Sequence, residues 1–177
     1  MRALKHDFVV CVAVGALVAC GGTGPDQRAS SGPVGSVGSL PAGASSVPVR
    51  RVQPPAYYSA FQTPARLLIK DAASWASAWK QIAGNASLLP PLPAVDFSTE
   101  MVIVLAMGSK PSSGYGIAIT GVARDQTGAL FVAATETSPA AKDCGLVTVI
   151  TSPVDFVIIP RSDANVSVAS QQVQSCG

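Results

Sequence analysis

Residues 101–107 read Met-Val-Ile-Val-Leu-Ala-Met, an apolar run that no polar residue interrupts. A strand with one solvated face alternates apolar and polar residues, whereas a continuous run of this kind is typical of a strand that is buried on both faces. The run therefore predicts a buried central strand at residues 101–107.

Other segments with strand character flank this run, and turns or loops separate them. The sequence Asp-Gln-Thr-Gly at residues 125–128 lies between two of them and is a favourable hairpin turn. A loop is expected at residues 87–95, because Pro90-Pro91-Leu92-Pro93 fits neither a helix nor a central strand. The expected strands are residues 65–69, 115–123, 130–137, 146–151 and 156–159.

One helix is expected between the first strand and the central one. Asp71 occupies an N-cap position before an alanine-rich segment, and Gly84 supplies the stop signal. Trp75, Trp79 and Ile82 follow one another at helical spacing, so both tryptophans lie on one face. They could form a platform that stacks on a ligand, but burial in the core is favoured because each can bury about 150–250 Å².

Together these elements predict an α+β fold in which one N-terminal helix packs on a mostly antiparallel β-sheet. The expected domain spans residues 56–177, which is enough chain for a single hydrophobic core. No internal repeat or second linker divides it.

The N-terminus has the pattern of a lipoprotein signal peptide. Arg2 and Lys5 form a charged region, and residues 8–17 form an apolar core that is too short for a membrane span of about 20 residues. The sequence Leu-Val-Ala-Cys at residues 17–20 reads as a lipobox, which predicts cleavage before Cys20 and acylation of this cysteine. An ordinary cleaved signal peptide with a coincidental cysteine is the alternative.

Acyl chains on Cys20 would hold the mature protein in a lipid membrane, because two or more chains anchor stably. Residues 20–55 are rich in Gly, Ser, Ala, Pro and Val and bury too little apolar surface to order, so a flexible tether is expected. The residue after this cysteine is Gly21 and not an Asp, which favours export of the lipoprotein to the outer membrane if the cell has two membranes. The expected location is the cell envelope.

Removal of residues 1–19 also removes His6, the sole histidine of the chain. Without imidazole, Ser/His/Asp triads, Cys/His dyads and the usual zinc hydrolase sites are excluded. The 12 Lys and Arg nearly balance the 10 Asp and Glu, so the chain lacks a basic footprint for nucleic acid, and it has no Gly-rich phosphate loop. We expect no enzyme activity, no catalytic residues, no metal site and no cofactor.

Two cysteines remain in the expected domain, Cys144 and Cys176. An even pair in an exported protein favours a disulfide. The bridge would close a loop of about 33 residues and stabilise the fold by roughly 3–4 kcal/mol in the chain-entropy model. It would pin a polar tail at residues 162–177 onto the loop before residue 146. Two free thiols, one of them reactive, are the alternative.

The connection at residues 108–117 joins two expected strands through a turn that contains Pro and Gly. Pro111 fixes one backbone angle and Gly114 permits a positive one, so the loop is expected to have a defined shape. Because loops on a rigid sheet commonly carry recognition, this loop is the predicted partner-binding site; a turn with no further role is the alternative. Its residues are Lys110, Pro111, Ser112, Ser113, Gly114 and Tyr115.

Four features follow one another along residues 61–161. They are the helix with Ser74-Trp75 and Trp79, the Asp96-Phe97-Ser98 start of the buried strand, the turn at residues 108–115, and the segment from Thr151-Ser152-Pro153 to Pro160-Arg161. In this order they resemble the PrcB C-terminal domain family, the protease complex subunit family of bacterial exported proteins. Val154 stands where an aromatic residue often follows, and residues 140–145 look like an insertion. The resemblance implies a non-catalytic lipoprotein that binds a protein, as an accessory or stabilising subunit of an exported protease.

Residues 110–115, Lys-Pro-Ser-Ser-Gly-Tyr, are also similar to the Asn-Pro-Thr-Thr-Gly-Tyr loop of chagasin-like cysteine protease inhibitors. Lys110 replaces the Asn, and neither of the two companion loops is evident. A peptidase inhibitor is therefore an alternative function, and a carrier of a small apolar ligand between helix and sheet is a further one. The sequence leaves the oligomeric state and the identity of the partner open.

Overall fold

The computed structural model describes residues 40–54, 59–84, 88–140 and 145–176. The expected signal peptide and Cys20 lie outside these residues, and so does Cys144. Within the described ranges, no helix combines the length and the apolar character that crossing a membrane requires. In chain order the elements are β1 (Ser45–Ser46), β2 (Pro64–Ile69), α1 (Ala72–Ala83), β3 (Glu100–Met107), β4 (Gly116–Arg124), β5 (Leu130–Pro139), β6 (Val154–Pro160) and β7 (Val166–Ser175).

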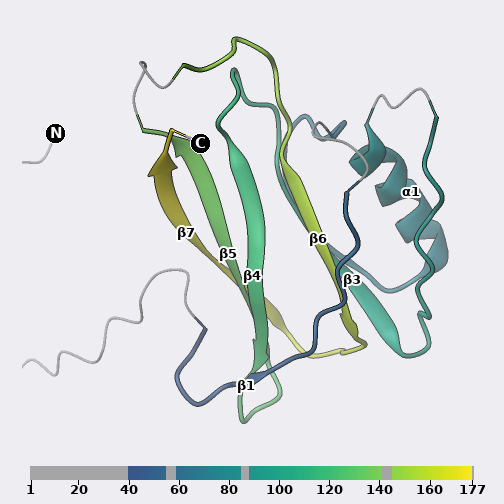
Figure 1. Cartoon of the computed structure of the whole chain (residues 1–177). Helices are drawn as coiled ribbons and strands as arrows, with labels where there is room; N and C mark the ends of the chain where they lie inside the picture. Colours follow the sequence, from purple (N-terminus) through teal and green to yellow (C-terminus); the bar gives the residue numbers. More distant parts are fainter. Residues whose placement is uncertain (1–39, 55–58, 85–87, 141–144, 177) are drawn as a thin grey trace, which may run out of the picture. The chain divides into compact units, whose positions relative to one another are not determined.

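The strands form two sheets, whereas the sequence predicts one (Figure 1). The four-stranded sheet has the order β1-β4-β5-β7, and the three-stranded sheet has the order β2-β3-β6. Neighbouring strands are antiparallel except β5 and β7, which are parallel. The helix α1 follows β2 and precedes β3, so it is not N-terminal to the strands. The described domain is therefore mostly β with one helix, and the expectation of an N-terminal helix on one sheet is corrected.

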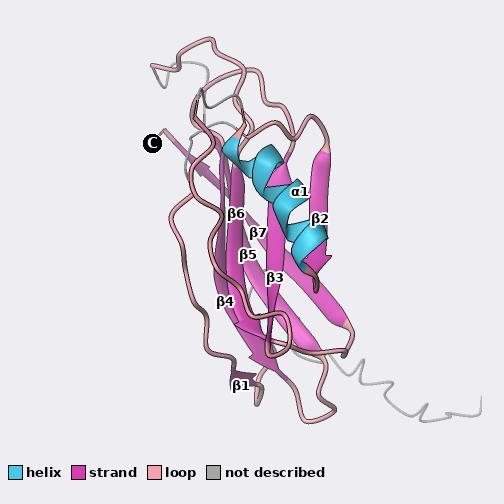
Figure 2. Cartoon of the chain, turned by 90° about the vertical axis from the view of Figure 1, so that its right-hand side faces the viewer, coloured by secondary structure: helices cyan, strands magenta, loops and turns pink. Residues whose placement is uncertain are grey.

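The central strand β3 explains why the domain has a layer on each side of the three-stranded sheet. On one face of β3, Val102 and Val104 belong to a core that they share with α1. On the other face, Met101 and Ile103 belong to a core that they share with the four-stranded sheet. Figure 2 shows α1 lying across the outer face of the three-stranded sheet. A strand with two apolar faces needs cover on both, and the second sheet provides what the helix cannot.

The two tryptophans of α1 are core residues, as the sequence predicts. Trp75 and Trp79 are buried, and their ring centroids lie 5.4 and 5.9 Å from that of Phe156 in β6. Their indole N–H groups donate hydrogen bonds of 3.0 Å to the carbonyl oxygens of Pro93 and Pro90. The proline-rich loop is thus fixed along the helix, which satisfies both indoles without exposing them.

Strands β2 to β6 agree with the expected segments to within about two residues, and the differences concern residues 146–151, β7 and β1. Residues 146–151 form no strand, and only Thr151 makes an isolated bridge, to Lys110. The segment expected to be a polar tail contains β7. This strand lies at the edge of its sheet and about every second residue along it is exposed, so its Val, Ser and Gln residues lack the apolar run of a central strand.

Residues 40–54, which the sequence assigns to the tether, pack on the domain. β1 pairs with β4, the Val47 N–H donates to the Val122 carbonyl at 2.8 Å, and Val47 is buried in the core between the sheets. Arg50 then forms an isolated bridge with Ile158 of β6. The domain therefore includes residues 40–54, because β1 pairs with β4 and Val47 is buried in the core. The composition of this segment does not predict that it contains a core residue.

Candidate functional site

The connection between β3 and β4 leaves the sheet through a tight backbone approach. Gly108 has a φ of +70°, and a Cβ atom at this position would lie 2.6 Å from the backbone carbonyl carbon of Thr63. The next residue, Ser109, donates its N–H to the Gln62 carbonyl at 3.1 Å. Glycine is required here for both its conformation and its lack of a side chain, so the loop starts from a fixed position against the chain that enters β2.

Residues 146–151 support the loop through a set of hydrogen bonds. Lys110 and Thr151 exchange backbone N–H to carbonyl bonds of 2.8 and 2.9 Å. The Ser113 N–H donates to the Val147 carbonyl at 3.0 Å, and the Val147 N–H donates to Ser113 Oγ at 2.9 Å. Thr151 Oγ1 donates to the Ser112 carbonyl at 2.9 Å. The predicted binding loop is therefore held in one shape by a neighbouring segment that forms no helix or strand.

The exposed part of this region is smaller and more apolar than the sequence suggests. Of the six predicted partner-binding residues, Pro111 is exposed, whereas Lys110, Ser112, Ser113, Gly114 and Tyr115 are half-buried. Because Lys110 pairs with Thr151 in antiparallel fashion, Pro111 lies beside Ile150. Ile150 is 73% exposed and Val147 is 63% exposed. We call Pro111, Val147 and Ile150 the loop surface; the sequence missed its two aliphatic members because their apolar pattern is typical of a strand.

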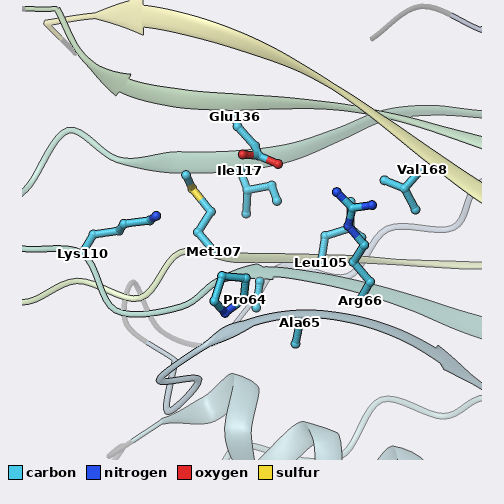
Figure 3. Close-up of a pocket in the computed structure, with 10 residues that line it drawn as sticks. Pro64, Ala65, Arg66, Leu105, Met107, Lys110, Ile117, Glu136 and Val168 are labelled. Carbon is cyan, nitrogen blue, oxygen red and sulfur yellow. The ribbon is translucent and has the colours of Figure 1, made fainter. Parts of the chain in front are cut away.

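A cleft of about 230 Å³ lies between the two sheets, next to the same loop (Figure 3). Residues from β2 and β3 line one wall, and residues from β4, β5 and β7 line the other. Lys110 of the loop extends into it, and its Nζ lies 5.6 Å from the centroid of the Tyr115 ring, within range of a cation–π contact. The cleft is lined by Pro64, Ala65, Arg66, Leu105, Ala106, Met107, Lys110, Ile117, Glu136 and Val168.

Charged groups reach the cleft from three different elements, as Figure 3 shows. Arg66 comes from β2, Lys110 from the loop and Glu136 from β5. Glu136 accepts a 2.8 Å hydrogen bond from the side-chain amide of Gln172 in β7. In the described part of the chain, ion pairs join Arg50 to Glu100, Arg51 to Asp155, and Lys70 to Asp163. None of these pairs includes Arg66 or Lys110, so both cations of the cleft lack a carboxylate partner there.

The opposite side of the sandwich is closed by a polar link between the sheets. Asp155 of β6 accepts hydrogen bonds from the Ile119 N–H of β4 at 2.7 Å and from Arg51 Nη1 at 3.3 Å. The Arg51 guanidinium also donates to the Ile119 carbonyl. The pairing of β4 with β5 is irregular between Ile119 and Gly121, which frees these backbone groups for the link. The sheets are thus tied together along β4 and β6, while the cleft lies toward β2 and β7.

The predicted disulfide lies only in part within the described residues. Cys144 lies outside the described residues, so its bridge to Cys176 stays a prediction. The parallel pairing of β5 with β7 sets Pro139 beside Ser175, and the Ala140 N–H donates to the Ser175 carbonyl at 3.3 Å. Cys176 follows directly on this last pair of the parallel register. Across the described ranges, no group of three or more His, Cys, Asp or Glu side chains could hold a metal ion.

Comparison with protein families gives one finding for this chain. Residues 101–160 match the family described as PrcB C-terminal. The matched segment runs from β3 to the end of β6, and it includes the loop at residues 108–115 and the loop surface. The resemblance predicted from the sequence is therefore confirmed over this segment. No curated protein and no solved structure matches the chain.

Proposed function

We propose that this chain, whose residues 101–160 carry a PrcB C-terminal domain, is an envelope lipoprotein that binds a protein partner as an accessory or stabilising subunit of an exported protease. The family match over residues 101–160 carries the proposal, because resemblance to this family implies an accessory, non-catalytic subunit of a protease complex. The absence of histidine after residue 19 agrees with a role in binding rather than hydrolysis.

The loop surface is the proposed contact for the protease component. Val147 and Ile150 expose large apolar side chains, and the segment that carries them is held by hydrogen bonds of Ser113 with Val147 and of Lys110 with Thr151. A surface that is already ordered loses little conformational freedom on binding, so its apolar contacts add more directly to affinity. Aliphatic side chains of this kind gain free energy when a partner removes them from water.

Membrane attachment is proposed through acyl chains on Cys20, with residues 20–39 as the tether between lipid and domain. A chain of this length and composition has an r.m.s. reach of about 25 Å. The domain could therefore meet a partner that is itself released from or bound to the envelope, and anchoring would raise the effective concentration of the two proteins.

A crosslinking experiment in envelope extract tests the proposed function. The wild-type lipoprotein should capture a protease, and the double variant Val147→Asp with Ile150→Asp should capture about tenfold less or worse, because buried charge opposes an apolar contact. Leu88→Asp is the matched control, since Leu88 is 86% exposed on the proline-rich loop. Both substituted aliphatic residues of the loop surface are exposed, so the variant should keep its melting temperature.

The activity of the captured protease then separates support from inhibition. An accessory subunit should leave the activity unchanged or increase the lifetime of the protease, whereas a chagasin-like inhibitor should lower the activity. Capture of no protease by wild type would overturn the proposed function. Equal capture by wild type and the double variant would show that the loop surface is not the contact.

A further inference from the structure

The cleft between the sheets exists because one face of β2 is left without full cover. Ala65, Leu67 and Ile69 pack toward the core of α1. Strand alternation directs Arg66 and Leu68 to the opposite face, toward the four-stranded sheet, where Leu68 is 48% exposed. Within the described chain, β2 pairs with β3 alone and forms the edge of its sheet. Its other edge therefore presents backbone N–H and carbonyl groups to any strand that approaches.

The size of the cleft favours side chains of a peptide over a free small molecule. Its volume is about 230 Å³. Sites for small molecules usually enclose about 300–1,000 Å³, so this space suits one or two side chains. Leu105, Met107 and Ile117 supply apolar lining, which fits an aliphatic side chain next to a polar one.

The charged residues of the cleft determine which charge a bound polar side chain should carry. Arg66 and Lys110 contribute two positive charges, and neither has a carboxylate partner among the described residues. Glu136 contributes one negative charge, and the Gln172 amide already donates to it. The cleft therefore has an excess of one positive charge over an apolar lining, so a carboxylate would add charge–charge attraction to the hydrogen bonds that a neutral amide would also accept from the two cations.

We propose that the cleft receives an acidic side chain from an extended segment of a partner protein, and that this segment adds as a strand to the free edge of β2. Main-chain hydrogen bonds along β2 supply affinity, and the fit of the acidic side chain between Arg66 and Lys110 supplies specificity. The inference rests on the proposed binding of a protein and names the chemistry of a second contact beside the loop surface.

The test uses pools of blocked octapeptides that are randomised except at one central position, which is Glu, Gln or Lys. The purified lipoprotein is immobilised, and the retention of each pool is measured. The Glu pool should be retained about tenfold more than the Gln pool, since the carboxylate adds charge–charge attraction to the two cations that the neutral amide lacks. Arg66→Gln and Lys110→Gln should each remove most of this preference. Lys80→Gln, which removes a charge from the exposed side of α1, should leave it intact.

Hydrogen exchange gives a second measurement, which electrostatic attraction of a peptide without strand addition would leave unchanged. Peptides selected from the Glu pool should slow exchange of the β2 amides, because strand addition bonds them. Equal retention of the Glu and Gln pools, or unchanged exchange in β2, would overturn the inference. So would an Arg66→Gln variant that self-associates yet keeps the peptide preference, because Arg66 would then only guard an edge strand.

The outcome is separable from that of the proposed function. Capture of a protease through Val147 and Ile150, together with no preference among the peptide pools, would overturn only the inference about the cleft and leave the proposed function standing. A clear preference for the Glu pool without capture of a protease would leave the cleft site standing and overturn the protease partner.

Discussion

Replacement of Gly108 by Ala tests how the candidate site is attached to the fold. With φ at +70°, alanine is strained in its backbone by about 1–2 kcal/mol. The added Cβ would also lie 2.6 Å from the Thr63 carbonyl carbon and 2.8 Å from Pro64 N, so the chain entering β2 must move. Overpacking of this kind costs about 1–3 kcal/mol, which brings the expected loss of unfolding free energy to about 2–5 kcal/mol.

Gly128→Ala is the matched control for this change. Gly128 lies in the β4–β5 hairpin at a φ of +90°, and a Cβ atom there would meet nothing within 4 Å. It should lose only the conformational part, about 1–2 kcal/mol. Urea unfolding followed by tryptophan fluorescence measures both variants, because Trp75 and Trp79 are buried in the folded state. The difference between the two variants isolates the close approach to β2.

Equal losses of unfolding free energy for Gly108→Ala and Gly128→Ala would refute this reasoning, since they would show that the start of β2 can move without a loss of stability. The expected larger loss at Gly108 should also weaken capture by the loop surface at temperatures where the variant is folded. The reason is that Ser109, the next residue, is bonded to Gln62 and sets the direction of the loop.

Three further changes test the capped helix, the acid response and the predicted disulfide. Asp71→Ala should lower the unfolding free energy by about 1 kcal/mol, because the Asp71 carboxylate caps α1; circular dichroism melts measure it, and Asp71→Asn should restore most of the loss. The hydrogen bond from Arg50 lowers the pKa of Glu100 from its usual 4.5. The stabilisation that ionised Glu100 contributes is therefore complete above pH 4.5 and is lost as the pH falls through the lowered pKa. Glu100→Gln should flatten the dependence of the melting temperature on pH in this acidic window, and an unchanged slope contradicts the assignment. Cys144→Ser should cost roughly 3–4 kcal/mol if it is bridged to Cys176, and an intact mass that reduction leaves unchanged would exclude the bridge.

The sequence predicts those parts of the fold that depend on local pattern. The apolar run at residues 101–107 becomes the doubly buried strand β3, and the spacing of Trp75 and Trp79 correctly places both on the buried face of α1. The hairpin turn at residues 125–128 is also found, with Asp125 Oδ1 accepting from the Thr127 N–H at 2.8 Å. In each case neighbouring residues carry the signal, so no long-range pairing needs to be known.

Features that depend on distant pairing were not predictable in the same way. Nothing local distinguishes one sheet from two, because the division depends on which strands pair. Residues 146–151 have the apolar pattern of a strand, yet they bond to a loop rather than to a sheet. The loop at residues 108–115 was identified from its turn chemistry, whereas the cleft that Lys110 enters requires β2 and β7 to face each other across the two sheets.

The edge of β2, where a partner strand is proposed to fit, lies on the side of the sandwich away from the polar link between the sheets. Asp155 and Arg51 close the sandwich along β4 and β6, and residues 40–54 add β1 and the Arg50 bridge on that side. On the other side the three-stranded sheet ends at β2, which pairs with β3 alone among the described residues. A strand added beside β2 would shield Leu68 from water and place one side chain between Arg66 and the opposite wall. The apolar cover that such a strand supplies is what the domain lacks on this side, and the unpaired cations define which strand can supply it.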